Sequence, residues 1–187
     1  MRIYLLSNDI ACVDAFHKHF DGLAHVSIHH DDFCSFMRSH HVECIVSPAN
    51  AFGIMDGGYD AAITEWFGLQ LQERVQAYIR DHYYGEQPVG TSFIVTAGKD
   101  EQMLIHTPTM RTPGVIRDPL IVYQAMRTTL MCAMEHHAES VLIPAFGAAT
   151  GNVHPLKVSR LMRKAYDQIM HPLTDFDWQK ILNDVIY

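Results

Sequence analysis

Short apolar runs alternate along the chain with longer segments in which apolar residues recur every three or four positions. The short runs predict buried strands, and the longer segments predict amphipathic helices. Strands are predicted at residues 2–7, 25–29, 42–47, 91–96, 103–106 and 140–144, with a polar turn at 98–100. Helices are predicted from a cap at Asn8 or Asp9 to residue 20, from a cap at Asp31 or Asp32 through residue 37, over 58–67, 69–83 and 119–136, from 155 to 170, and once more within 176–187.

This alternation of strands and helices predicts an α/β domain with helices on both faces of one sheet. The chain has 187 residues, of which 48% are hydrophobic, and this suits one compact domain with a substantial core. No internal repeat, linker or low-complexity tract divides the sequence. A single domain over residues 1–187 is therefore expected.

Charge and residue usage argue against several classes of function. The net charge of −7 and the lack of a run of lysine or arginine argue against a nucleic-acid partner. No apolar run is long enough to cross a bilayer, and the N-terminus lacks a secretory signal pattern. The four cysteines have no paired spacing, which favours free thiols and a cytoplasmic location. Thirteen histidines include no zinc-binding spacing, so no metal or other cofactor is predicted.

Three predicted strands lead into loops of polar and small residues, which is where sheets of this kind bind ligands. The loop at 47–60 contains an amide, Asn50, then adjacent glycines and a carboxylate, Asp60, beside the start of a helix. The loop at 145–152 has small residues that let backbone N–H groups approach a pyrophosphate. The loop at 30–33 offers a carboxylate and an aromatic ring to a purine. Together the loops favour a nucleotide sugar as ligand.

The same loops resemble those of the macrodomains, a family that binds ADP-ribose. The family's Val-Asp-Ala-Ile-Val-Asn-Ala-Ala-Asn strand and loop is similar to Val42-Glu43-Cys44-Ile45-Val46-Ser47-Pro48-Ala49-Asn50. Its Gly-Gly-Val-Asp and Ala-Ile segment matches Gly57-Gly58-Tyr59-Asp60-Ala61-Ala62-Ile63. Its strand ending in Pro-Ala, with a small-residue turn, resembles residues 141–151, and its Gly-Asp-Ile loosely resembles Asp31-Asp32-Phe33. The resemblance covers residues 25–170 in order.

The resemblance implies a three-layer α/β/α macrodomain with a mixed, mainly six-stranded sheet, in which residues 1–24 add an N-terminal strand and helix. It implies that the partner is ADP-ribose or an ADP-ribosylated protein. Asn50 would bond a hydroxyl of the distal ribose, and Asp60 would orient or activate the attacking water of a hydrolase. Asp32 would accept from the adenine amino group. The residues expected at the ligand, besides the catalytic pair Asn50 and Asp60, are Asp32, Phe33, Ser47, Ala49, Gly57, Gly58, Tyr59, Phe146, Gly147, Ala148, Ala149, Thr150, Gly151 and Asn152.

Three departures from the family pattern leave the activity open between a hydrolase and a reader that binds without turnover. Ser47 replaces the usual first asparagine, residues 54–56 replace further glycines, and Phe146 stands where a small polar residue is frequent, so its ring would stack on the distal ribose or narrow the entrance. A phosphatase acting on ADP-ribose 1″-phosphate fits the same loops but lacks an evident nucleophile. Each residue also has a plainer interpretation. Asn50 could only form a turn, and Asp60 could only favour the start of its helix.

Three further points stay open at the level of sequence. Arg111 could pair with a phosphate or a carboxylate of the partner, or could simply be an exposed arginine in a loop. The pattern does not indicate whether residues 1–24 contact the ligand site. It also gives no oligomeric state and no natural substrate.

Overall fold

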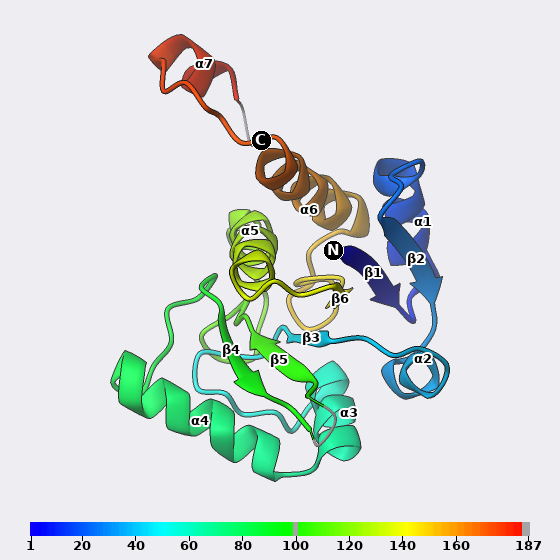
Figure 1. The fold of residues 1–187 in the computed structure, drawn as a ribbon, viewed down its shortest axis with the longest axis vertical. Coiled ribbons are helices and arrows are strands. Elements are labelled where there is room, and N and C mark those ends of the chain that lie inside the picture. The colour runs from blue at the N-terminus through cyan, green and yellow to red at the C-terminus, as the bar shows by residue number, and fades with distance from the viewer. Residues whose placement is uncertain (99–100, 185–187) are drawn as a thin grey trace.

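The computed structural model describes residues 1–98 and 101–184, and its elements alternate much as the apolar pattern predicts (Figure 1). Residues 99 and 100 of the predicted turn, and the last three residues of the segment 176–187, lie outside the described part. The elements in chain order are β1 (Arg2–Ser7), α1 (Ile10–Phe20), β2 (Val26–His30), α2 (Phe33–Ser39), β3 (Cys44–Ser47), α3 (Gly58–Phe67), α4 (Gln70–Tyr83), β4 (Phe93–Thr96), β5 (Met103–His106), α5 (Leu120–Glu135), β6 (Ser140–Pro144), α6 (Pro155–Met170) and α7 (Trp178–Asn183).

The strands form one six-stranded sheet in the order β2-β1-β6-β3-β5-β4. Neighbouring strands are parallel except for β4, which runs antiparallel to β5 at the edge. The predicted fold class, an α/β arrangement around a mixed six-stranded sheet, is therefore confirmed. Because five strands are parallel, their carboxyl ends meet at one edge of the sheet, and the loops that follow them are brought together there.

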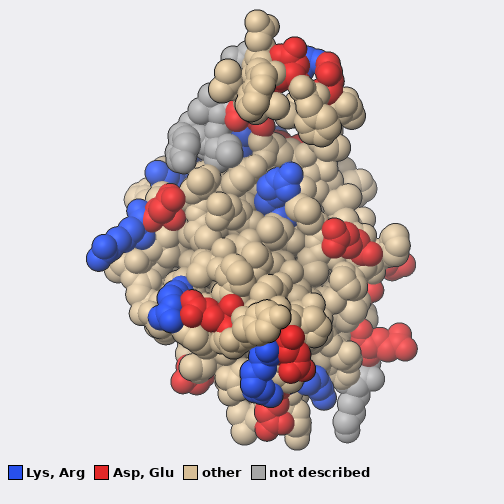
Figure 2. Space-filling model, turned by 90° about the vertical axis from the view of Figure 1, so that its left-hand side faces the viewer, with Lys and Arg blue, Asp and Glu red and all other residues tan. Residues whose placement is uncertain are grey.

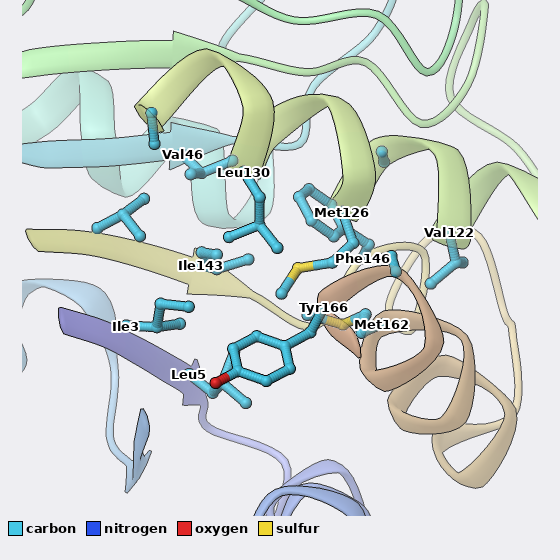
Figure 3. Close-up of a cluster of buried hydrophobic side chains, with 14 of the residues drawn as sticks. Ile3, Leu5, Val46, Val122, Met126, Leu130, Ile143, Phe146, Met162 and Tyr166 are labelled. Atoms are coloured by element: carbon cyan, nitrogen blue, oxygen red, sulfur yellow. The ribbon is translucent and has the colours of Figure 1, made fainter. Parts of the chain in front are cut away.

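Helices cover both faces of the sheet, as the alternation of apolar side chains along the strands requires. Along β3, Cys44 and Val46 point to the face covered by α1, α5 and α6, whereas Ile45 points to the face covered by α2, α3 and α4. Figure 3 shows the first of these two cores, with side chains of β1, β3, β6, α5 and α6 packed together. The residues of both cores are almost completely buried. Two cores on opposite faces make the sheet a rigid platform for the loops at its edge.

Aspartates fix the starts of the two helices that follow β1 and β2. Asp9 accepts a hydrogen bond from the N–H of Ala11 at 2.9 Å, and Asp32 accepts one from the N–H of Ser35 at 2.9 Å. Each carboxylate thus satisfies an N–H group that has no partner inside its helix. Of the two candidate caps predicted for each helix, the structure selects Asp9 and Asp32.

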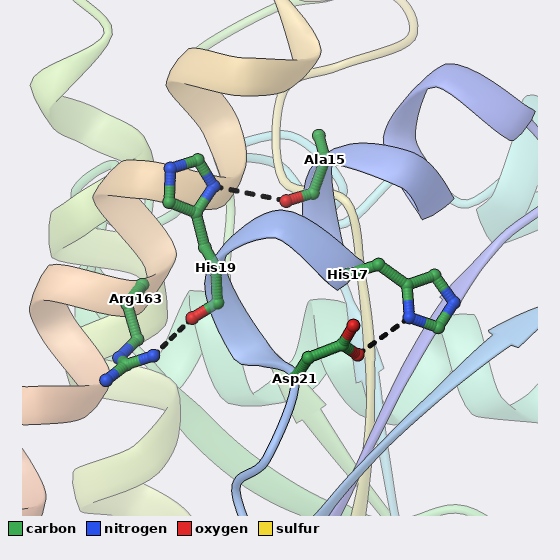
Figure 4. A network of polar contacts seen from close by, with 5 residues as sticks. All are labelled: Ala15, His17, His19, Asp21 and Arg163. Carbon is green, nitrogen blue, oxygen red and sulfur yellow. Dashed lines mark hydrogen bonds and ion pairs between the residues drawn. The ribbon is translucent and has the colours of Figure 1, made fainter.

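The N-terminal strand lies inside the sheet, and the N-terminal helix packs beside α6 (Figure 1). Strand β1 pairs with β2 on one side and with β6 on the other. Arg163 of α6 donates to the backbone carbonyl of His19 in α1, as Figure 4 shows. The same figure shows a pair at the end of α1 itself, between His17 and Asp21 at 2.8 Å. The ring Nδ1 of His19 also lies 2.7 Å from the hydroxyl of Ser159. Residues 1–24 therefore supply an interior strand of the sheet.

Two expectations from composition can be checked in the described residues. Cys12, Cys34, Cys44 and Cys132 are all free thiols, and all but Cys34 are buried. None of the helices in residues 1–98 and 101–184 combines the length and apolar character needed to cross a lipid bilayer.

Candidate functional site

A cavity of about 570 Å³ opens at the carboxyl edge of the parallel strands. Its wall comes from the loops that follow β1, β2, β3, β5 and β6, and from the first turns of α2 and α3. This volume lies within the range of small-molecule sites in proteins, roughly 300 to 1,000 Å³. The three loops that the sequence selects are all part of the wall, so segments distant in the chain form one site.

The side chain of Asn50 uses most of its hydrogen-bonding groups within its own loop, the loop after β3. Its Nδ2 donates to the carbonyl of Ile54 at 2.7 Å, and its Oδ1 accepts from the N–H groups of Phe52 and Ile54 at 3.1 and 3.3 Å. A side-chain amide has two donor hydrogens, so one remains for a ligand. Asn50 lines the cavity, but its demonstrated contacts are those of a residue that holds the loop in shape.

Gly57 and Gly58 border empty space. A Cβ atom added at either glycine would meet no protein atom within 4 Å. Both line the cavity, just before and at the start of α3. Gly58 also has φ +52°, a conformation that favours glycine. The lack of side chains here leaves room beside the backbone, which fits the predicted close approach of a ligand.

Asp60 is a buried carboxylate on the cavity wall. It is 9% exposed, and its Oδ1 accepts a hydrogen bond of 2.6 Å from the hydroxyl of Ser47. Burial raises the pKa of Asp60 to about 7, although the hydrogen bond from Ser47 lowers it. An acid with a pKa near neutrality can take up and release protons under physiological conditions. Among the described residues, this is the carboxyl group of the cavity best suited to proton transfer.

The loop after β6 carries N–H groups without protein acceptors. Residues 147–151 all line the cavity. Within the described residues, the N–H groups of Gly147, Ala149, Thr150 and Gly151 have no hydrogen-bond acceptor. Backbone N–H groups of this kind form the anion-binding concavities of phosphate sites. The predicted pyrophosphate loop thus has the free donors that its role requires.

Gly147 and Gly151 of this second loop have no room for a side chain, which the sequence does not show. A Cβ at Gly147 would lie 2.7 Å from the Cδ1 atom of Ile116, and one at Gly151 would lie 2.5 Å from the same atom. At Gly151 the Cβ would also lie 2.6 Å from the carbonyl oxygen of Gly147. These two glycines therefore accommodate a neighbouring loop of the protein, in contrast to Gly57 and Gly58.

At the other end of the cavity, Asp32 and Phe33 are held by local contacts. Asp32 accepts from the N–H and the hydroxyl of Ser35, at 2.9 and 2.7 Å, and these bonds lower the pKa of its carboxyl group. Phe33 is 2% exposed and packs edge to face on Tyr59, with the ring centroids 5.4 Å apart. The Tyr59 hydroxyl is buried and has no hydrogen-bond partner in the described part of the chain. All three residues line the cavity.

Three predicted ligand residues do not line the cavity. Phe146 is completely buried in the core between β6 and α5 (Figure 3), because the turn after Pro144 directs its ring to the sheet face that α5 and α6 cover. The expectation that its ring covers the ribose or narrows the entrance is therefore wrong. Ser47 is also fully buried and contacts Asp60 in place of the ligand space. Asn152 is exposed beyond the end of the lining segment.

The cavity also contains residues that sequence reasoning missed. The last residue of β1, Ser7, and the loop residues Asn8 and Asp9 line the cavity, so the N-terminal segment reaches the site. The rule that found the other loops, polar residues just after a parallel strand, would have found this one. The remaining unpredicted lining residues are Leu6, Cys12, Asp31, Pro48, Ile54, Asp56, Ala62, Thr109, Met110, Pro113, Pro144 and Ala145.

Arg111 does not line this cavity, and its guanidinium is already paired. Its guanidinium donates to both carboxylate oxygens of Glu86, at 2.7 and 2.9 Å, and lies 5.0 Å from the ring centre of Phe52. Of the two readings of Arg111, the structure supports an exposed loop residue, with an ion pair to Glu86 as its anchor. Among the described residues no group of three or more histidine, cysteine, aspartate or glutamate side chains is arranged to hold a metal ion.

Comparison with protein families identifies this architecture. The family model described as "Macro domain" matches residues 46–162, which is more than half of the chain. The chain belongs to the Macro domain family. The match begins within β3 and ends within α6, so it includes the first loop with Asn50 and Asp60 and the second loop at 145–152. The resemblance expected from those loops is confirmed.

Two curated proteins resemble this macrodomain in sequence. An uncharacterized protein of Aeropyrum pernix is 34% identical over 120 residues, which are 63% of this chain and 60% of that protein. An uncharacterized protein of Aquifex aeolicus is 30% identical over 154 residues, which are 75% of this chain and 89% of that protein. This macrodomain thus spans less than two thirds of the first relative and most of the second.

Solved macrodomains share the fold. The macrodomain of Oceanobacillus iheyensis solved with ADP superimposes with a TM-score of 0.60 at 20% identity, over 68% of each chain. A mutant of the same protein solved with ADPR gives a TM-score of 0.62 at 18% identity, over 73% of this chain and 75% of that one. At these identities the likeness shows a common fold, and the ligands are those of the Oceanobacillus protein.

Proposed function

We propose that this macrodomain binds ADP-ribose in the cavity at the carboxyl edge of its sheet. The support is the combination of an unfilled space at Gly57 and Gly58, free N–H groups in the second loop, and the aromatic and carboxylate groups of Phe33 and Asp32. In the proposed pose the diphosphate lies on the second loop, the distal ribose lies beside Asn50, and the adenine lies near Phe33. ADP and ADPR occupy a solved protein of the same fold, which is consistent with this pose.

We further propose that the domain hydrolyses an ester of ADP-ribose, either on an acidic protein side chain or in O-acetyl-ADP-ribose. The single observation that carries this proposal is the buried Asp60, whose pKa of about 7 suits a general base. In the protein ester, which joins the side chain to the anomeric carbon of the distal ribose, Asp60 takes a proton from water as the water oxygen bonds to that carbon. The bond from that carbon to the ester oxygen breaks, and the carboxylate leaves with the electron pair. Asp60 then releases its proton to solvent.

The residues of the cavity also bear on the two alternative functions, a reader domain and a phosphatase. A reader domain would use the cavity without proton transfer, and the hydrogen bonds of Asn50 within its own loop are compatible with that role. We therefore assign Asn50 to the shaping of the loop and Asp60 to the chemistry. A phosphatase needs a nucleophile, and the thiol lining the cavity, Cys12, has its pKa raised to about 11 chiefly by burial. Such a thiol is protonated at neutral pH, which disfavours it as a nucleophile.

Gly57 provides the direct test of ADP-ribose binding. Calorimetric titration of the wild type should give saturable binding of ADP-ribose, with an increase in melting temperature. Gly57→Val should fold normally, because Gly57 has φ −130° and its Cβ would meet no protein atom within 4 Å. The added methyl groups would crowd the ligand space without filling it, so we expect a loss of affinity of about tenfold, or about 1.4 kcal/mol.

The smaller variant Gly57→Ala should give an intermediate loss, and both variants should melt near the wild-type temperature without ligand. Absence of ADP-ribose binding by the wild type would refute the proposed function. Unchanged affinity in Gly57→Val would place the ligand elsewhere.

Ser47 is expected to set the pH at which the domain works. Its hydroxyl stabilises the ionised form of Asp60, so Ser47→Ala should raise the pKa of Asp60 above its value of about 7. A general base acts when ionised, so hydrolysis should rise with pH, and its midpoint should move to higher pH in the variant. The measurement is the pH profile of single-turnover ester hydrolysis.

Ser159→Ala is the matched control, because Ser159 is an equally buried hydroxyl bonded to His19 on α1. ADP-ribose affinity should stay unchanged in both serine variants. A pH profile that keeps its wild-type midpoint in Ser47→Ala would remove Ser47 from the proton transfer.

A further inference from the structure

Residues 109–118, which we call the strap, connect the two loops that form the proposed ADP-ribose site. At its start, Met110 forms a parallel bridge with Asn50, and the carbonyl of Met110 accepts from the N–H of Ala51 at 3.1 Å. Near its end, the N–H of Ile116 donates to the carbonyl of Gly151 at 2.9 Å. The side chain of Ile116 also fills the space over Gly147 and Gly151. The strap is thus fastened to the first loop at one end and to the second loop at the other.

The strap forms a second hollow, of about 330 Å³, which lies against the main cavity. Thr109, Met110 and Pro113 line both spaces, so the strap is their common wall. The middle of the strap, residues 112–115, is exposed. A group attached to a ligand beside Asn50 therefore reaches the second hollow by passing over Met110 and Pro113.

The two spaces differ in charge. Among the residues that line the main cavity there is no lysine or arginine. Its charged residues are five aspartates: Asp9, Asp31, Asp32, Asp56 and Asp60. The second hollow is lined by Arg111, Arg117 and one carboxylate, Asp118. Arg111 is neutralised by Glu86, whereas Arg117 is exposed and has no ion-pair partner within the described residues. In a chain of net charge −7, this places a cationic group next to an acidic cavity.

We propose that the second hollow receives an acidic stretch of the polypeptide that carries the ADP-ribose, with Arg117 as its charge-recognition residue. This inference rests on the proposed function, because the modified side chain must leave the cavity beside the distal ribose. Arginine binds carboxylates in a planar, two-bonded geometry, and an exposed one is free to do so. In this proposal Arg117 recognises the protein part of the substrate, and the main cavity recognises ADP-ribose.

An acidic polypeptide fits this surface better than a nucleic acid does. Binding of a phosphate backbone requires an extended set of cations. On the face of the described residues drawn in Figure 2, lysine and arginine are interspersed with aspartate and glutamate and do not form a continuous basic surface. The overall negative charge would repel a polyanion at longer range, whereas a short acidic segment needs only the local contact at Arg117.

The test is charge reversal at Arg117, measured as binding by Asp60→Asn proteins so that the probe is not cleaved. Three probes are compared: free ADP-ribose, a peptide ADP-ribosylated on one glutamate among other acidic residues, and the same peptide with those neighbours changed to glutamine or asparagine. Arg117→Glu should leave the affinity for free ADP-ribose unchanged. It should lower the affinity for the acidic peptide about three- to tenfold, the effect expected when an exposed charge pair is replaced by a repulsive one. The affinity for the neutral peptide should change little.

Arg2→Glu is the matched control, since Arg2 is an exposed arginine at the amino end of β1, on the opposite edge of the sheet. It should leave all three probes unchanged. Equal losses for the acidic and neutral peptides, or none for either, would overturn the inference. So would a larger effect of Arg117→Glu on an ADP-ribosylated oligonucleotide than on the acidic peptide. Failure of the proposed function has a different signature, because then free ADP-ribose would not bind the protein with native Arg117.

Discussion

Asp60→Asn is expected to reduce ester hydrolysis by about 100-fold or more, the range in which removal of a general base falls. The amide keeps nearly the size of the carboxylate and can still accept the hydrogen bond from Ser47, so the wall of the cavity should persist. The affinity for ADP-ribose should therefore change little. Single-turnover hydrolysis and calorimetric titration measure the two quantities separately.

Asp81→Asn serves as the control, because Asp81 is an exposed carboxylate on α4, outside the cavity. It should hydrolyse like the wild type. If the wild type cleaves an ADP-ribose ester and Asp60→Asn does so at the same rate, Asp60 is not the base. If the wild type binds ADP-ribose and cleaves no ester, the domain is a reader.

The same substitution should stabilise the fold at alkaline pH. The folded-state pKa of Asp60, about 7, is above its value near 4 in an unfolded chain. Between these values the folded state retains a proton that the unfolded state has released, so the free energy of unfolding falls as the pH rises through this window. An asparagine does not ionise, so the free energy of unfolding of the variant does not fall in this way. At pH 8 the variant should gain at most about 4 kcal/mol over the wild type, and the gain should disappear near pH 4.

Denaturant unfolding at several pH values provides the measurement. A difference between Asp60→Asn and wild type that stays constant from pH 4 to pH 8 would mean that burial does not perturb the ionisation of Asp60.

Gly151→Ala is expected to destabilise the fold severely, by about 3 kcal/mol. The new methyl group would lie 2.6 Å from the carbonyl oxygen of Gly147 and 2.5 Å from the Cδ1 atom of Ile116. A side chain can rotate away, but the carbonyl belongs to the backbone of the same loop and can move only by distorting the loop. Melting temperature should fall by roughly 6–12 °C in a domain of this size.

Gly147→Ala offers a matched comparison on the same loop. Its clash is with the flexible end of Ile116, at 2.7 Å, and its φ of +71° adds strain of about 1–2 kcal/mol for an alanine. The second substitution Ile116→Ala should therefore relieve part of the defect in Gly147→Ala, whereas Gly151→Ala should stay defective in the same background. Equal relief of both glycine variants would show that the backbone contact at Gly151 is unimportant.

Much of the architecture follows from the sequence because strands and helices here have distinct apolar periods. Strand β1 and strand β6 have the bounds that their apolar runs predict, since both are buried on both faces. Strand β3 begins at Cys44, two residues later than predicted, although Val42 is just as buried. Burial extends beyond the ladder of hydrogen bonds at that point, so an apolar pattern overestimates the length of the strand.

The loops of the site could be found from the sequence, but the direction of each side chain could not. Residues after a parallel strand must lie at the carboxyl edge, so the loops at Asn50, Asp60 and 147–151 were predictable from order alone. Whether a side chain faces the cavity or the core depends on the turn between them. Phe146 faces the core and Ser47 contacts Asp60 because of packing between segments that are far apart in the chain.

The position of β1 has a consequence for anyone who dissects this domain. The family match covers residues 46–162 and therefore excludes β1 and β2. Strand β1 pairs with one side of β6, and β2 pairs with the other side of β1. A fragment cut at the limits of that match would leave one side of β6, a strand that is apolar on both faces, as an open edge that can pair with other chains. For this chain we expect the family match and the smallest independently folding segment to differ, and expression trials should therefore retain residues 1–45.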